Sequence, residues 1–132
     1  MSMSNASETA LLNLLFNNTD WANVGDAAGL QNSAAAGSFY VALHTADPTD
    51  AGNQTTSEAA YTGYARVAVA RTGGGWTVSG NQVSNTATVQ FGECTAGSAT
   101  VTHFSVGLLS AGAGDILYSG ALSASRAVSA GI

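Results

Sequence analysis

Short runs in which apolar and polar side chains alternate, separated by glycine-rich turns, are the feature that most constrains the fold of this chain. In the first run, FYVALH from 39 to 44, Phe39, Val41 and Leu43 lie on one side of an extended strand. The same period of two returns in YARVAVAR, WTVS, VSNTATVQF, TVTHFSVGLL and DILYSGAL, and glycines between the runs supply turns. Six or more short strands of this kind predict a mainly β protein, an antiparallel β-sandwich or jelly-roll-like barrel.

The segment NASETALLNLLF, residues 5–16, has instead the spacing of a short N-terminal α-helix. Asn5 is the predicted N-cap, with Glu8 three places later to return the hydrogen bond. Because a helix of about 12 residues is marginal alone, its apolar side must be buried, on its own domain or on another subunit. The candidate assembly interface on this helix consists of Leu11, Leu12, Leu14, Leu15 and Phe16.

The length of the chain, 132 residues, fits a single domain spanning 1–132. Within it, residues 1–37 hold the helix and an irregular connector with room for a second short helix. Residues 38–132 form the predicted β-sandwich.

Most of the surface must consist of uncharged residues, because charged residues make up only 8% of the chain, against about 25% in a typical domain. Ser, Thr, Asn, Gln, Gly and Ala fill this role, and such small side chains suit permanent assembly because they lose little rotamer entropy when a partner packs on them. The only strong cations are Arg66, Arg71 and Arg126, too few for a row of phosphates, so we expect no direct binding of nucleic acid. The net charge of -5 disfavours anionic membranes, and neither an export signal nor a membrane span is found.

His44, followed by Asp47 and Asp50, raises the question of a catalytic or metal-binding group. The chain has only two histidines and one cysteine, and His44, His103 and Cys94 show no metal-ligand spacing. The acids after His44, with Asn53, do not follow the order of a calcium loop. We therefore predict that His44 ends a strand, that a solvated turn follows, and that the protein holds no metal and no cofactor.

The chain contains no recognisable motif for nucleophilic catalysis, because G-x-S-x-G is absent. The Gly73–Gly75 run is not a phosphate-binding loop either. Cys94 is predicted to be a small buried residue, and His103 a hydrogen-bonded strand histidine. The aromatic residues lie in separate runs and are assigned to the core or to subunit contacts, so we expect no enzyme. They are Tyr61, Tyr64, Trp76 and Tyr118.

The order of the motifs ALHTADP, GYAR and LYSGAL after a leucine-rich helix resembles a group of small virion proteins of tailed bacteriophages. The resemblance spans about residues 8–132. Members are labelled tail-fibre proteins or head decoration (cement) proteins, so the resemblance implies an assembled, non-enzymatic β protein of the phage particle. Relatives usually continue past the segment matching RAVSAGI into one more apolar strand. Either that strand is absent here or the sequence is part of a longer product, and a missing partner would leave an unpaired edge that a neighbouring subunit could complete.

Within that class we expect a capsid decoration protein, because the compact chain lacks the shaft repeats or heptads of a fibre. It would be made in the host bacterial cytoplasm and bind the major capsid protein on the capsid exterior. Because shell junctions are three-fold or quasi-three-fold, self-association as a homotrimer is expected. The alternative is a tail-fibre or other tail-associated adsorption protein.

Overall fold

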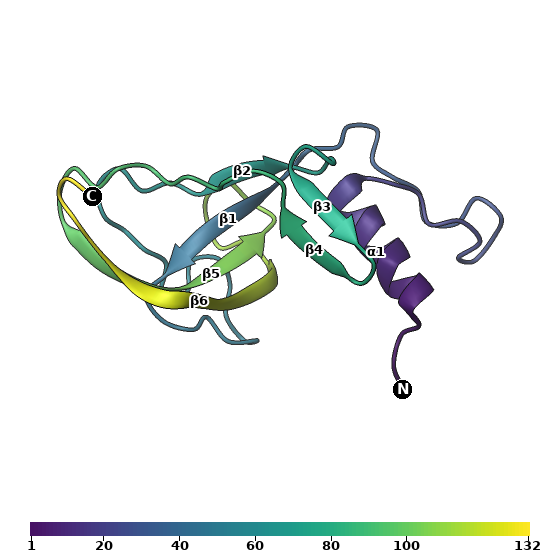
Figure 1. The fold of residues 1–132 in the computed structure, drawn as a ribbon, viewed down its shortest axis with the longest axis horizontal. Helices are drawn as coiled ribbons and strands as arrows, with labels where there is room; N and C mark the ends of the chain where they lie inside the picture. The colour runs from purple at the N-terminus through teal and green to yellow at the C-terminus, as the bar shows by residue number, and fades with distance from the viewer. The chain divides into compact units, whose positions relative to one another are not determined.

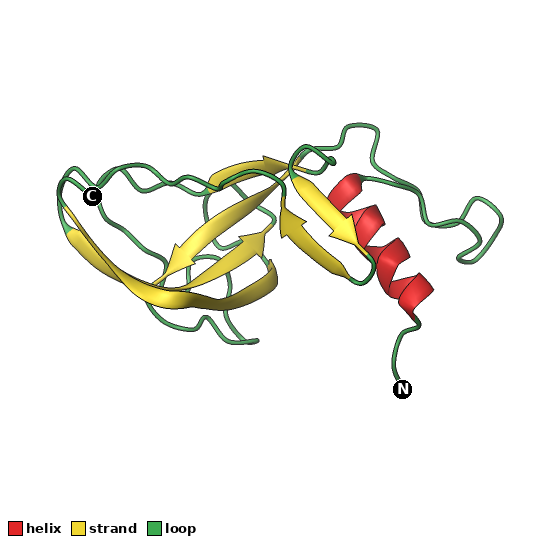
Figure 2. Ribbon diagram, viewed as in Figure 1, coloured by secondary structure: helices red, strands yellow, loops and turns green.

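A computed structural model describes residues 1–132, which form one helix and six strands (Figure 1). Strands β2, β1, β5 and β6 form one sheet in that order, and β3 pairs with β4 in a separate hairpin (Figure 2). The pairs β1/β5, β5/β6 and β3/β4 are antiparallel. The predicted mainly β class with a short N-terminal helix is therefore confirmed. The jelly-roll form stays a prediction. The elements are α1 (Asn5–Asn17), β1 (Ser38–His44), β2 (Val67–Ala70), β3 (Trp76–Ser79), β4 (Gln82–Asn85), β5 (Ser98–Gly107) and β6 (Ile116–Ser129).

The chain forms two compact units. The first contains Met1–Ser38 and Val69–Thr88, and the second contains Phe39–Ala68 and Val89–Ile132. The helix thus shares a unit with the β3–β4 hairpin, which the sequence analysis had placed with the other strands. The prediction of a single domain stays a prediction.

In the first unit, α1 packs against the β3–β4 hairpin. Phe16 and Leu12 are buried, and the ring of Phe16 meets that of Trp76 edge to face, with centroids 4.9 Å apart. The Thr9 hydroxyl also donates to the carbonyl of Gly80 at 2.7 Å. The apolar side of the helix therefore finds partners within its own unit, which helix formation at this length requires.

The N-cap of α1 is Ser4, so the prediction of Asn5 was wrong by one residue. The Ser4 hydroxyl accepts from the Ser7 N–H at 3.3 Å, and its carbonyl accepts from the Glu8 N–H. Serine is as good a cap as asparagine, and Glu8 then lies one position too late to return the hydrogen bond. With 13 residues, the one helix is too short to cross a bilayer.

The connector after α1 forms an isolated bridge between Trp21 and Leu30 and no second helix. It is tied back by Arg71, whose guanidinium donates to the carbonyls of Leu14 and Leu15 at the end of α1 and to that of Ala36. These bonds satisfy carbonyls that a helix end leaves without partners.

In the second unit, β6 is an edge strand that pairs only with β5. Pairing runs from Gly107 with Ile116 to Ser98 with Ser129, but residues 122–125 of β6 lie opposite Thr102 alone, which makes a bulge. The core of this unit is a buried cluster with partly buried side chains around it. The cluster consists of Ala59, Tyr61, Cys94 and Val101, with Leu43, Tyr64, Ala99, Leu122 and Val128 packed against it.

Three strands differ clearly in length from the sequence prediction, and the first of them, β2, covers only Val67–Ala70 of the predicted YARVAVAR run. Only residues 83–85 of the predicted 83–91 region belong to a strand, because β4 ends at Asn85. Strand β6, in contrast, continues beyond the predicted DILYSGAL run to Ser129. The sequence ASRAVS in this extension has little apolar character, and its pairing with the start of β5 makes it a strand. Pairing with a neighbour thus overrides a weak local pattern.

Candidate functional site

The loop joining β5 to β6, residues 108–115, displays two large apolar side chains to solvent. Leu108 is 42% exposed and Leu109 is 49% exposed. Asp115, at the end of the loop, is also exposed, and its side chain makes no hydrogen bond or ion pair. Single exposed leucines are common and need no explanation, whereas two adjacent exposed leucines on a hydrogen-bonded loop are a feature to explain.

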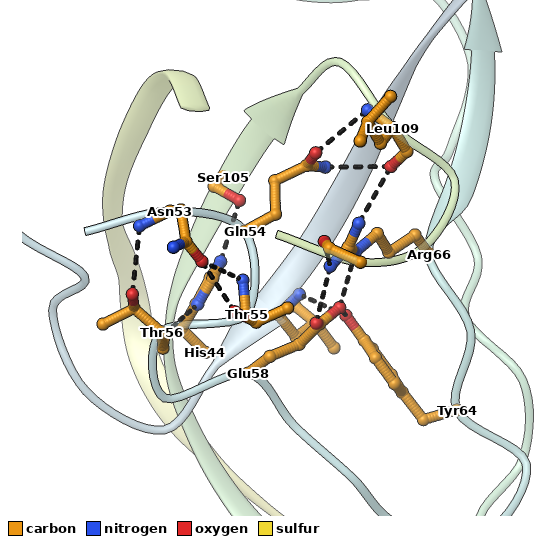
Figure 3. Close-up of polar contacts among 12 residues, drawn as sticks. His44, Asn53, Gln54, Thr55, Thr56, Glu58, Tyr64, Arg66, Ser105 and Leu109 are labelled. Carbon is orange, nitrogen blue, oxygen red and sulfur yellow. Dashed lines mark hydrogen bonds and ion pairs between the residues drawn. The ribbon is translucent and has the colours of Figure 1, made fainter. Parts of the chain in front are cut away.

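Gln54 holds the loop from inside the protein (Figure 3). Its side chain is completely buried, donates from Nε2 to the Leu109 carbonyl at 3.1 Å and accepts at Oε1 from the Leu109 N–H at 2.9 Å. Its own backbone N–H donates to the carbonyl of Gly114 at 2.9 Å. A Cβ at Gly107 or Gly114 would come within 2.2 Å of the Gln54 side chain, so both glycines make room for it.

Arg66 holds the same loop from a second direction. Its guanidinium donates to the carbonyls of Leu109 at 2.9 Å and Gly112 at 2.8 Å. The same group forms a bidentate pair with Glu58, at 2.7 Å and 2.8 Å. This hydrogen-bonded pairing raises the pKa of Arg66, so the cation is fixed in its charged form.

Tyr64 extends this pair towards strand β1. Its hydroxyl donates to Glu58 Oε1 at 2.9 Å and accepts from the N–H of Leu43 at 3.1 Å. Burial, with a smaller contribution from the adjacent Glu58, raises the pKa of Tyr64. The phenol therefore remains a neutral donor over the whole physiological range.

His44 and Ser105 form a second buried polar contact beside Gln54. His44 Nδ1 lies 2.8 Å from the carbonyl oxygen of Thr56, which can only accept, so this nitrogen carries a hydrogen. Nε2 lies 2.8 Å from the Ser105 hydroxyl and accepts from it in a neutral ring. Serine beside histidine resembles a nucleophile and its base, but both side chains are completely buried, so a substrate has no access to them.

These contacts together fix the segment from His44 to Arg66 against the sheet and, through it, the β5–β6 loop. We name the exposed loop 108–115 the docking loop, and the residues that fix it the support network. The support network consists of His44, Gln54, Glu58, Tyr64, Arg66 and Ser105. A satisfied buried polar network rigidifies what it holds, so the loop is held in one conformation.

The residues after His44 form the exposed turn that the sequence predicts. Strand β1 ends at His44, and Asp47 accepts from the Thr49 N–H at 2.9 Å in an exposed turn. Asn53 likewise accepts from the N–H of Thr55, and Asp50 is exposed. The structure contains no group of three or more histidine, cysteine or acidic residues close enough together to hold a metal ion.

Cys94 and His103 also occupy the predicted environments. Cys94 is completely buried, with Sγ 3.4 Å from the Ala96 carbonyl oxygen. His103 lies in β5, and its Nδ1 is 2.8 Å from the hydroxyl of Thr102. Both predictions are confirmed.

The candidate assembly residues on α1 divide into two groups. Leu12 and Phe16 are buried within their own unit, so in this conformation they contribute to its core. Leu11, Leu14 and Leu15 are partly exposed. Their use as an assembly interface stays a prediction.

Sequence reasoning missed most of the support network. Gln54, Glu58 and Ser105 stand in no motif, and the hydrogen bonds of Gln54 reach 55 residues along the chain. The one available signal was the scarcity of cations. With only three arginines and eight acidic residues in the chain, Arg66 could have been expected to pair with an acidic residue.

A family model described as "Gp80: Podophage GP4 fiber I protein gp80" matches residues 2–131. The chain belongs to this family. The predicted membership in a family of small tailed-phage virion proteins is thereby confirmed. No curated protein matches the chain. For a member of a podophage fibre family, a rigidly held loop with exposed leucines is a feature that an assembling structural protein can use.

Proposed function

We propose that this protein is a non-enzymatic structural subunit of a fibre on a tailed-phage particle, and that it attaches to its neighbours through the docking loop. The observation that carries the proposal is the exposure of Leu108 and Leu109 on a loop that Gln54 and Arg66 hold by three hydrogen bonds to the backbone of Leu109. The name of its family supports the fibre assignment.

A loop that is fixed before binding lowers the entropic cost of association. Ordering a flexible loop at an interface costs about 0.5–1.5 kcal/mol for each immobilised side chain, and a loop that is already fixed avoids much of this. Burying an exposed leucine contributes about 1.5–3 kcal/mol. Two leucines on a prepared loop therefore form an efficient contact, and the small uncharged side chains elsewhere on the surface add little desolvation cost.

The second candidate is a capsid decoration protein, a homotrimer that binds the major capsid protein on the capsid exterior. What favours it is the absence from the sequence of shaft repeats or heptads that would join an attachment point to a tip. Its mechanism is mechanical, because area buried across junctions must be exposed again when the shell is pulled apart.

Quantitative mass spectrometry of purified particles, followed by separation of heads from tails, distinguishes these functions. A fibre subunit is expected at a few to tens of copies per particle, and its gene deletion reduces adsorption while heads stay intact. A decoration protein is expected at hundreds of copies, and its deletion weakens the shell. Absence of the protein from washed particles contradicts both.

A further inference from the structure

We propose that the docking loop of one copy binds a groove at the far end of the β5–β6 pair of another copy, with Asp115 of the loop paired to Arg126 of the groove. The inference deepens the proposed function and rests on it, because it names the partner of the docking loop as a second copy of this chain.

The receiving groove is a half-open cavity of about 500 Å³ in the second unit. Its size suits a pair of apolar side chains. Arg126 lies at the groove on β6 and is exposed, without a hydrogen bond or ion pair. Glu93 is a second charged residue of the lining. The apolar lining includes Leu43, Tyr61, Phe91, Leu122, Val128 and Ile132.

Arg126 is the cation that internal contacts leave available. Arg66 is held by Glu58 and two carbonyls, and Arg71 by the carbonyls at the end of α1. In a chain with eight acids and three strong cations, a carboxylate of another copy is the most abundant complement to Arg126. The docking loop offers such a carboxylate, Asp115, close in sequence to its two exposed leucines.

The loop and the groove lie at opposite ends of the β5–β6 pair. Gly107 pairs with Ile116 next to the loop, whereas Val101 pairs with Arg126 and Ala99 with Val128 at the groove. A contact between two different patches of identical copies leaves one loop and one groove unused, so it repeats. Repetition gives a ring when the rotation closes and an open chain when it does not; a ring of three fits a decoration protein, and an open chain fits a fibre.

Charge reversal tests the pairing on the full chain. We expect Asp115→Arg alone and Arg126→Glu alone each to weaken self-association at least about 10-fold, because each brings like charges together. Both reversals combined in one chain are expected to regain wild-type association, since every loop then meets a groove of opposite charge whether the copies form a ring or an open chain. Sedimentation velocity over a range of concentrations gives these constants.

Two further variants test the apolar contact and supply the control. Leu109→Ser should weaken association by about 10- to 100-fold, which corresponds to one buried leucine. Asp50→Arg makes the same charge change at an exposed site outside the loop and groove and should leave association unchanged. Thermal unfolding checks that each variant remains folded.

A wild-type protein that stays monomeric at every concentration overturns the inference, as does a doubly charge-reversed chain that fails to regain association. Either result leaves the proposed function standing if the protein is found in purified particles. Absence from the particles, with association intact, refutes the proposed function and not the contact.

Discussion

Replacing Gln54 with methionine tests whether the support network holds the docking loop. Methionine fills a similar volume but removes both side-chain hydrogen bonds to Leu109 while keeping the backbone bond from residue 54 to Gly114. A typical buried hydrogen bond contributes about 1 kcal/mol net, so the free energy of unfolding should fall by about 2 kcal/mol. Urea unfolding measures this as a lower midpoint with an unchanged slope.

Hydrogen exchange localises the effect of Gln54→Met. The Leu109 amide loses its acceptor, so its exchange should accelerate about 30-fold if local opening becomes easier by about 2 kcal/mol. The matched control is Gln82→Met, an exposed glutamine of β4, which should change stability by less than about 0.5 kcal/mol. If Gln54→Met behaves like this control and Leu109 keeps its protection, the loop is not held by Gln54 and the reasoning is refuted.

Three further substitutions test other contacts. Glu58→Gln removes the charge partner of the Arg66 guanidinium, whose side chain is 3% exposed, so we expect the free energy of unfolding to fall by about 2–4 kcal/mol. The control Glu93→Gln, at an exposed site, should change it very little. Equal losses would contradict the importance of the pair. Folding raises the pKa of Tyr64, so its contribution to the free energy of unfolding is complete below about pH 10, the pKa of the unfolded chain, and is lost as the pH rises above it. Tyr64→Phe should therefore flatten the fall in the free energy of unfolding above about pH 10. An unchanged slope in alkaline denaturation would refute this. Phe16→Ala should lower the free energy of unfolding by about 3–5 kcal/mol, because the ring is 1% exposed and its removal leaves a cavity. A loss of less than about 1 kcal/mol in thermal or urea unfolding would show that α1 does not need this packing.

Strand β1 could be predicted from the sequence because its large apolar residues alternate with polar ones, whereas the same alternation in residues 86–91 forms no strand. Phe39, Val41 and Leu43 identified β1 in this way. The second half of β6 could not be found, because its small side chains carry no pattern and its conformation depends on pairing with β5. The N-cap differed by one residue because Ser4 and Asn5 are both good caps.

The candidate site was less accessible to sequence reasoning than the fold. His44 was correctly placed at the end of a strand, but its hydrogen bond to Ser105 joins residues 61 positions apart. Gln54 reaches Leu109 over a similar separation. Such contacts depend on the register of β1 and β5, which a single sequence does not specify, and glutamine has no local preference that marks it as buried.

The most direct test of the central claim is hydrogen exchange of the docking loop in purified phage particles compared with the isolated protein. If the loop is the attachment element, amides in a peptide covering residues 107–116 should exchange at least about 10-fold more slowly in the particle, while the exposed β3–β4 turn around Gly80 serves as an internal reference. Identical exchange of the 107–116 peptide in both states, with the protein present in the particles, would contradict the claim that this loop joins the protein to its neighbours.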